Sequence, residues 1–230
     1  MERLDKVIGQ RTAYSRQDAR ILCRQGRVTV NGEKVWDQKH KVKPDDVLTI
    51  DKEVIEPLPE FVKFHKPAGV ISSMNDDWNR ESLADVLPEE WIGKLHPVGR
   101  LDADTTGLLI FSSDGKITQK LLHPSHAVER EYLATVENPV NSGSLRKILA
   151  EGVTTAEGVV QAELLEVSGQ CVRLSVTEGK YRMVRRVLAN SGHPVVSLHR
   201  LRYGEIRLGK LPEGEFATFD EAELKWIKSI

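Results

Sequence analysis

Hydrophobic residues near the N-terminus follow the spacing of one helix face. Ala19 and Leu22 lie three positions apart, with charged and polar residues around them. Ser15 precedes this stretch and Asp18 falls in its first turn, which is typical of a helix N-terminus because both side chains can accept hydrogen bonds from unpaired backbone N–H groups. Gly26 stands where a C-terminal glycine ends a helix. The pattern predicts a helix between residues 15 and 26.

The next segment changes to the alternating pattern of a strand. Val28 and Val30 alternate with polar residues and lead into Asn31-Gly32, a pair that favours a tight hairpin because both turn positions need positive φ. A second turn is predicted at residues 43–46, and residues 47–50 are predicted to form a closing strand. We therefore expect a small unit made of a helix and a β-hairpin in the first 50 residues.

Residues 51–60, DKEVIEPLPE, have the composition of a linker. The stretch is acidic and contains Pro57 and Pro59, and proline-rich polar segments connect domains more often than they form helices or strands. We expect the boundary here, which gives two domains, residues 1–58 and residues 59–230.

Beyond the linker, strand-like runs with β-branched residues occur among segments with helical spacing, which predicts an α+β domain. The expected strands cover residues 61–65, 69–73, 107–112, 130–136, 160–167, 171–177 and 195–200. The expected helices cover residues 82–87, 115–122, 142–151, 180–190 and 220–229. Asp220 is the expected N-cap of the last helix.

The composition is that of a soluble globular protein, with 40% hydrophobic and 29% charged residues. No apolar run approaches the roughly 20 residues that a membrane-spanning helix needs, and the charged N-terminal segment lacks the apolar centre of a signal peptide. We expect a cytoplasmic protein. Its two cysteines, Cys23 and Cys171, are too few for a disulfide framework or a zinc site.

Basic residues gather in two segments of a nearly neutral chain. The formal net charge is -1, but residues 1–43 carry eleven Lys/Arg against five Asp/Glu, and residues 172–210 carry nine against two. Two basic surfaces favour a long polyanion that is bound at two places. A pair of solvated charged faces is the alternative, and charge alone leaves it open.

The first basic segment contains a row of arginines. Arg16, Arg20 and Arg24 recur every four residues and so share one face of the predicted helix, where guanidinium groups suit phosphate binding. The pattern SRQDARILCRQGRVTVNG resembles the small RNA-binding domain first recognised in ribosomal small-subunit protein four, over about residues 2–50. The resemblance implies that the RNA contacts are Ser15, Arg16, Arg20, Arg24, Gln25 and Arg27.

The segment 99–109, GRLDADTTGLL, joins a polar loop to an apolar strand. Asp102 and Asp104 are typical of turn residues whose side chains bond to nearby backbone. From the residues alone, turn formation is the simpler interpretation, and the spacing itself does not indicate catalysis.

The same segment resembles the central motif of pseudouridine synthases of the RsuA and RluA types, G-R-L-D-x-x-T-[ST]-G-L-L. Three further motifs occur in that family's order: Lys66-Pro67-Ala68-Gly69, Arg130-Glu131-Tyr132, and EGKYRMVRR at residues 178–186. Together with the N-terminal domain, the resemblance spans nearly the whole chain. It implies a catalytic domain built on a mixed, mainly antiparallel sheet.

The resemblance also assigns roles to three residues. Asp102 stands at the position of the catalytic aspartate, Arg185 at that of its basic partner, and Tyr132 at that of the aromatic residue on which the extruded uracil stacks. Tyr132 also lies in a strand-like run, EYLATV, so a core position is the alternative to the stacking role.

Four more basic residues near these motifs are expected to contact RNA: Arg100, Lys180, Arg182 and Arg186. The chain departs from the family pattern at Arg182-Met183, where His-Gln is the usual pair. No catalytic role is therefore assigned to these two positions.

The implied reaction breaks the bond between ribose and a base nitrogen, turns the uracil, and rejoins it through a ring carbon. No electrons or phosphate change hands, so we expect no cofactor, and the histidines do not group at metal-ligand spacing. Asp102 would act either as a nucleophile or as a base that takes a proton from the sugar, and the sequence leaves both routes open. An adjacent arginine favours the ionised carboxylate and fixes its rotamer.

The opening R-L-D-K, the TTGLL run and the stretch HPSHAVEREYLATVENPV look most like the small-subunit branch of the family. That likeness implies an enzyme that modifies one uridine of 16S ribosomal RNA, either as RNA or in an assembling particle. We expect the protein to be a monomer. The alternatives are a paralogue acting on 23S ribosomal RNA and a non-catalytic RNA-binding assembly factor. A glycosidase-like hydrolase is disfavoured, because Asp102 and Asp104 on one loop do not flank a bond at the ~5–9.5 Å separation that such enzymes use.

Overall fold

A computed structural model describes residues 1–75 and 78–230, and the chain forms two compact units. The N-terminal unit comprises residues 1–59 and 87–95, and the larger unit comprises residues 60–86 and 96–230. Grouping of residues 87–95 with the N-terminal unit was not anticipated from the sequence. The division into domains at residue 58 stays a prediction, and each unit is described by itself.

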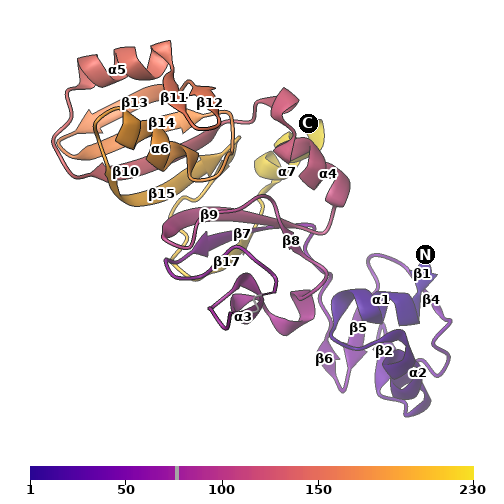
Figure 1. Cartoon of the computed structure of the whole chain (residues 1–230). Helices are drawn as coiled ribbons and strands as arrows, with labels where there is room; N and C mark the ends of the chain where they lie inside the picture. The colour runs from indigo at the N-terminus through magenta and orange to yellow at the C-terminus, as the bar shows by residue number, and fades with distance from the viewer. Residues whose placement is uncertain (76–77) are drawn as a thin grey trace. The chain divides into compact units, whose positions relative to one another are not determined.

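The N-terminal unit packs two helices against a small antiparallel sheet with strand order β3-β2-β5-β6 (Figure 1). A separate pair joins β1 and β4. Its elements are β1 (Glu2–Arg3), α1 (Leu4–Arg11), α2 (Arg16–Arg24), β2 (Val28–Val30), β3 (Glu33–Lys34), β4 (Lys41–Val42), β5 (Leu48–Ile50) and β6 (Glu53–Val54).

The turn and cap signals in this unit are confirmed. Ser15 and Asp18 form a capping box at the start of α2, each side chain accepting from the other's backbone N–H. Asn31 and Gly32 have φ of 51° and 84°, as the hairpin turn requires. Strand β6 lies inside the segment that we expected to be a linker, and this part of the prediction was wrong because residues 53–54 pair with β5.

The larger unit is built on a mixed sheet with the order β13-β14-β10-β15-β9-β7-β17 (Figure 1). In addition, β16 pairs with β15 and β8 pairs with β9. Strands β9 and β15 run parallel, whereas the other described neighbours run antiparallel. The predicted α+β class with a mainly antiparallel sheet is confirmed. The strands are β7 (Phe61–Lys66), β8 (His96–Pro97), β9 (Thr105–Ser112), β10 (Arg130–Val136), β11 (Val153–Thr155), β12 (Gly158–Val160), β13 (Glu163–Ser168), β14 (Cys171–Val176), β15 (Val195–Tyr203), β16 (Ile206–Arg207) and β17 (Phe216–Thr218).

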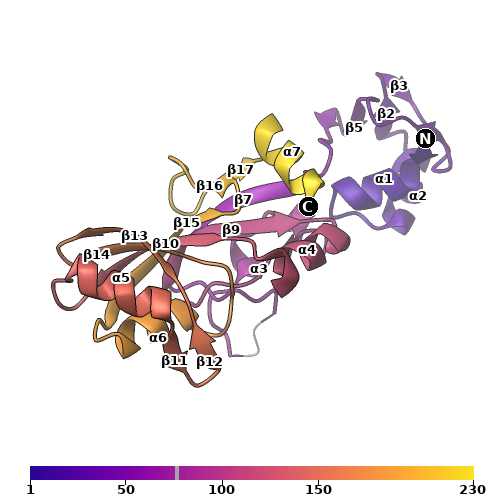
Figure 2. The same ribbon diagram turned by 90° about the horizontal axis from the view of Figure 1, so that it is seen from above.

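The helices of the larger unit coincide with the predicted segments to within a few residues. They are α3 (Leu83–Val86), α4 (Gly115–Leu122), α5 (Ser142–Glu151), α6 (Met183–Asn190) and α7 (Glu221–Ser229). Helix α5 packs along β13, and α6 contacts β11 and β15. Helix α7 starts with a capping box at Asp220 and lies beside β7 (Figure 2). The two elements are joined by Glu223, which accepts two hydrogen bonds from Lys63.

Two predicted strands, residues 69–73 and residues 160–167, do not form as expected, because polar groups within them bond to other loops or helices. Residues 69–73 make only an isolated bridge through Ile71, and the Ser72 side chain bonds the backbone of Leu101 in another loop. The predicted strand 160–167 is interrupted where the Ala162 N–H donates to the carbonyl of Leu149 at the end of α5. Strand β12 therefore ends at residue 160 and β13 begins at residue 163.

Each unit has its own buried apolar core. In the N-terminal unit Leu4, Ile8 and Leu48 are at most 1% exposed, and in the larger unit Leu108 and Ile110 of β9 are fully buried. Helix α1 contributes two of these core residues, although no side chain at its N-cap marks its start. None of the described helices is long and apolar enough to cross a lipid bilayer.

Candidate active site

Asp102 lies in the loop that leads into β9. Residues that follow β7 hold this loop in place through hydrogen bonds. The Ser72 hydroxyl donates to the carbonyl of Leu101 at 2.6 Å and accepts from its N–H at 3.0 Å. The N–H of Gly69, which has a φ of +93°, donates to the carbonyl of Ala103 at 2.8 Å. A turn closes the loop, with the Thr105 N–H donating to the carbonyl of Asp102 at 3.0 Å. The backbone around Asp102 is thereby fixed before any substrate binds.

Lys66 fastens the same loop from the last position of β7. Its side chain is fully buried, and Nζ donates to the carbonyls of Pro67 at 2.8 Å, Ala103 at 3.3 Å and Thr105 at 3.0 Å. Burial lowers the pKa of Lys66 from 10.5 to about 8, although the nearby negative charges of Asp104 and Asp102 act in the opposite direction. The amine of Lys66 therefore bonds the backbone carbonyls of the residues on both sides of Asp104.

The carboxylate of Asp102 is accessible and close to a cation. Its side chain is 24% exposed, and Oδ2 lies 3.9 Å from Nη1 of Arg182. Within residues 1–75 and 78–230 this carboxylate accepts no hydrogen bond, so it does not serve as a turn cap. The Asp102 carboxylate is therefore accessible to a ligand, and the backbone that carries it is held rigidly.

Arg182 reaches this position because of a local backbone feature. It occupies the N-cap of α6 in the left-handed conformation, with φ 48° and ψ 29°. From there its guanidinium bonds both carboxylate oxygens of Asp104, at 3.2 and 3.0 Å. Burial alone would raise the pKa of Asp104, but the Arg182 hydrogen bonds and the charge of Arg185 outweigh it, and the pKa lies below its usual value.

The pairing that we expected for Arg185 is not the one found. Arg185 is 9% exposed on α6, and its Nη2 donates to the backbone carbonyl of Asp104 at 3.0 Å and lies 3.2 Å from that residue's carboxylate. Its Nη1 donates to the carbonyl of Val195 at 3.3 Å. Arg185 thus ties α6 to β15 and to the loop through Asp104, and Arg182 is the arginine beside Asp102. The side-chain identity of each position does not reveal which of two neighbouring carboxylates a guanidinium meets.

Tyr132 lies on β10 at the level where β9 begins. In the sheet, Arg200 of β15 is the cross-strand partner of Tyr132 on one side and of Gly107 on the other. The tyrosine is 8% exposed, so most of its ring is packed. A side chain at Gly107 would collide with the backbone of Arg200, with a Cβ only 2.3 Å from its carbonyl oxygen, which explains a glycine five residues after Asp102.

The other predicted RNA contacts of the larger unit are at or near the surface. Arg100 and Lys180 are exposed, and Lys180 forms an ion pair with Glu178 at 2.7 Å. Arg186 donates to Glu157 at 2.9 Å and lies over the ring of Tyr181, 5.0 Å from its centroid. Tyr181 was not among the expected site residues, because its 65% exposure next to Arg182 does not follow from the motif.

In the N-terminal unit, the arginine row lies on the exposed face of α2. Arg16, Arg20 and Arg24 are all exposed. Arg27, by contrast, bonds both oxygens of Asp51, and Gln25 accepts a hydrogen bond from it at 3.2 Å. The side chain of Ser15 is engaged in the helix cap.

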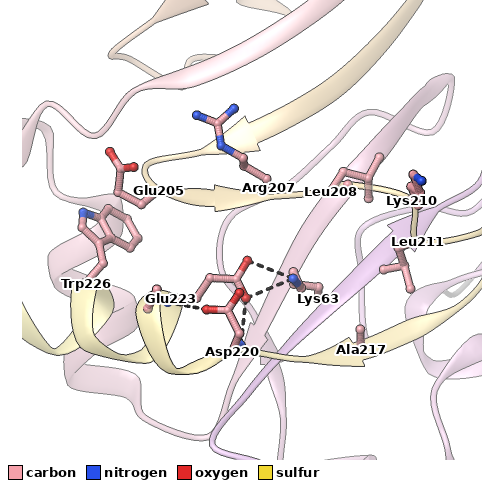
Figure 3. Close-up of a pocket in the computed structure, with 12 residues that line it drawn as sticks. Lys63, Glu205, Arg207, Leu208, Lys210, Leu211, Ala217, Asp220, Glu223 and Trp226 are labelled. Atoms are coloured by element: carbon pink, nitrogen blue, oxygen red, sulfur yellow. Dashed lines mark hydrogen bonds and ion pairs between the residues drawn. The ribbon is translucent and has the colours of Figure 1, made fainter.

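A separate hollow of about 710 Å³ lies among β7, β16, β17 and α7 (Figure 3). Its lining includes Lys63 and Glu223, which form an ion pair, and also Arg207, Lys210 and Trp226. It contains none of the predicted catalytic residues. Among the residues that the structure describes, no group of three or more His, Cys, Asp or Glu is placed to hold a metal ion.

The comparisons with known proteins cover both units. Residues 60–190 match the family described as RNA pseudouridylate synthase, and residues 2–48 match the S4 domain. An uncharacterized RNA pseudouridine synthase of Aquifex aeolicus is 33% identical over 99% of this chain and 97% of its own length. Ribosomal large subunit pseudouridine synthase B of Bacillus subtilis is 33% identical over 100% of this chain and 97% of its own.

A solved structure, the crystal structure of a pseudouridylate synthase, superposes with a TM-score of 0.69 at 30% identity, covering 99% of this chain and 100% of the other. The protein is therefore an enzyme of the isomerase class that acts on uridine in RNA. The chain belongs to the RNA pseudouridylate synthase family and carries an N-terminal S4 domain.

Proposed function

We propose that this enzyme converts a uridine of ribosomal RNA to pseudouridine and that Asp102 is its catalytic residue. The observation that carries the proposal is the accessible Asp102 carboxylate, 3.9 Å from Arg182, on a loop held by Lys66 and Ser72. A catalytic side chain on a fixed backbone loses little conformational freedom when the substrate binds, which lowers the entropic cost of reaching the reactive geometry.

The reaction requires one carboxylate near the ribose. The bond between N1 and C1′ breaks, the uracil turns, and a bond forms between C5 and C1′. The hydrogen on C5 leaves as a proton and N1 gains one, so the product is an isomer of the substrate. Asp102 would act either by attacking the sugar covalently or by taking a proton from it. Both routes start from the ionised carboxylate, and Nη1 of Arg182 lies 3.9 Å from its Oδ2 atom.

We propose that Arg182 and Arg185, at the start of α6, have different roles. Arg182 stands beside Asp102 and would contact both it and the substrate's phosphate or sugar, whereas Arg185 keeps the loop attached to α6 through Asp104. Tyr132 would present the exposed part of its ring to the uracil after extrusion, since its strand is level with the start of β9.

RNA would be bound by both units. In this proposal residues 1–58 form the RNA-binding domain, in which Arg16, Arg20 and Arg24 contact phosphates, and residues 59–230 form the catalytic domain. Arg100, Lys180 and Arg186 add contacts near Asp102. The enzyme is taken to act as a cytoplasmic monomer, as expected from the sequence.

Two observations bear on which ribosomal RNA is the substrate. The sequence motifs resemble the small-subunit branch, whereas the similar proteins of Bacillus subtilis, Vibrio cholerae and Shigella flexneri carry the name ribosomal large subunit pseudouridine synthase B. The match covers 97% of the Bacillus protein, which favours large-subunit RNA as the first candidate and 16S RNA as the second.

The test is tritium release. Each ribosomal RNA is prepared with tritium on C5 of its uridines and incubated with the purified enzyme, as naked RNA and as ribosomal particles. We expect release of one equivalent from one of the two RNAs. No release from either would contradict the proposal, and mapping the modified base would identify the uridine.

A further inference from the structure

An exposed aromatic ring stands next to the candidate active site. Tyr181 is 65% exposed, whereas Tyr132 and Tyr203 of the same unit are 8% and 1% exposed. It directly precedes Arg182, the residue 3.9 Å from the Asp102 carboxylate. An exposed ring one residue from the arginine beside Asp102 is available for stacking with a base of the substrate RNA.

The ring is held in place from one side. The guanidinium of Arg186 lies 5.0 Å from the ring centroid and is itself bonded to Glu157 at 2.9 Å, in the turn between β11 and β12. The same hairpin is fastened to α6 by the Asn190 side chain, which donates to the carbonyl of Thr154 at 2.8 Å. A ring oriented in advance loses less conformational freedom when a ligand stacks on it.

We infer that Tyr181, with Arg186 behind it, forms a stacking subsite for a nucleobase that flanks the target uridine in the substrate RNA. The inference rests on the proposed function. When the target base leaves its stack, its neighbours lose a stacking partner, and an aromatic ring at the mouth of the site replaces it. The subsite is distinct from Tyr132, which is packed in the sheet on β10.

The charges around the ring match a nucleic acid. Lys180, Arg182 and Arg186 lie within five residues of Tyr181, and each keeps part of its side chain at the surface. A base would contact the ring while the phosphates on either side contact these cations, which is how sequence-tolerant sites for single-stranded RNA are built.

The experiment combines protein and RNA changes. A short RNA around the mapped uridine is made in its natural form and with an abasic ribose at the 5′ or the 3′ neighbour, and kcat and KM are measured by tritium release. The proteins are wild type, Tyr181→Ala, Tyr181→Phe and, as a control, Ile148→Ala, which removes another exposed apolar side chain, from α5.

With the natural RNA, we expect Tyr181→Ala to lower kcat/KM roughly tenfold, and Tyr181→Phe and Ile148→Ala to stay within about twofold of wild type. At one neighbour, the abasic RNA lowers wild-type kcat/KM by a similar factor but leaves Tyr181→Ala almost unaffected, because the stacking partner is already missing.

The inference would be overturned if the effects of Tyr181→Ala and of the abasic ribose on kcat/KM multiplied at both neighbours. It would also be overturned if Tyr181→Ala were as active as wild type. Either result would leave the proposed function standing. A wild-type enzyme that releases no tritium from either ribosomal RNA would overturn the proposed function, and the stacking subsite with it. Thermal unfolding of each variant separates a missing stacking interaction from a damaged fold.

Discussion

Arg182, whose backbone is in the left-handed conformation, donates two hydrogen bonds to the carboxylate of Asp104, at 3.2 and 3.0 Å. This pairing fixes the guanidinium where its Nη1 is also 3.9 Å from the carboxylate of Asp102. Asp104 therefore acts as a positioning residue: it holds the cation that the reactive carboxylate needs.

Replacing Asp104 by Asn should reduce turnover without unfolding the protein. The change removes the negative charge that both Arg182 and Arg185 bond, and at a carboxylate that is 51% exposed such ion pairs contribute up to about 1 kcal/mol each. We expect kcat to fall about tenfold or more, with KM changing less. Glu151→Gln, at a 66% exposed carboxylate on α5, is the matched control. Wild-type kcat in Asp104→Asn would show that the pair does not position Arg182.

The same pair predicts a pH dependence of stability. Because the pKa of Asp104 is lowered in the folded state, its ionised form stabilises the fold above the unfolded pKa of about 3.9, and this contribution is lost as pH falls through the lower folded value. The difference in free energy of unfolding between wild type and Asp104→Asn should be present at pH 6 and shrink toward pH 3. Chemical denaturation across this range measures it, and a constant difference would contradict the assignment.

Lys66 predicts a decline of activity at alkaline pH. Its protonated amine supplies three hydrogens to three carbonyls, and the neutral amine has only two, so deprotonation with a pKa of about 8 leaves the loop less firmly held. We expect kcat/KM to fall above about pH 8. Over the same range the free energy of unfolding should rise, because the unfolded chain keeps its proton up to about pH 10.4.

A pH–rate profile tests the predicted fall in kcat/KM, and chemical denaturation at several pH values tests the predicted rise in the free energy of unfolding. Activity that stays flat to pH 10 would mean that the loop does not depend on the charge of Lys66.

The arginine row of α2 predicts a salt effect. The triple change of Arg16, Arg20 and Arg24 to Ala should weaken RNA binding and flatten the plot of log K against log salt by up to ~0.7–0.9 for each phosphate that is no longer neutralised. Lys147→Ala, at a 78% exposed lysine on α5, should leave the slope unchanged. If the triple variant keeps the wild-type slope, these side chains do not bind phosphate.

Much of the fold follows from local signals in the sequence. The cap at Ser15, the turn at Asn31-Gly32 and the cap at Asp220 each depend on a few adjacent residues, and all three occur as predicted. Helix α1 and the break between β12 and β13 escaped prediction because they depend on distant partners. Helix α1 is stabilised by burial of Leu4 and Ile8, and the break by a hydrogen bond to α5.

The site was only partly predictable for the same reason. The motif identified Asp102 and the arginines of residues 182–186, but motifs do not specify which carboxylate a guanidinium meets. That choice depends on the left-handed backbone of Arg182 and on the burial of Arg185 against β15, which emerge only in three dimensions. The anchoring of the loop by Ser72 likewise joins residues far apart in the sequence.

The central claim is that Asp102 performs the chemistry, and a single measurement addresses it: tritium release by Asp102→Asn beside wild type, under single-turnover conditions on the RNA that wild type modifies. The substitution keeps the size of the side chain and removes its charge. We predict that Asp102→Asn binds the RNA with wild-type affinity and releases no label above background. Release at a rate near that of wild type would contradict the account.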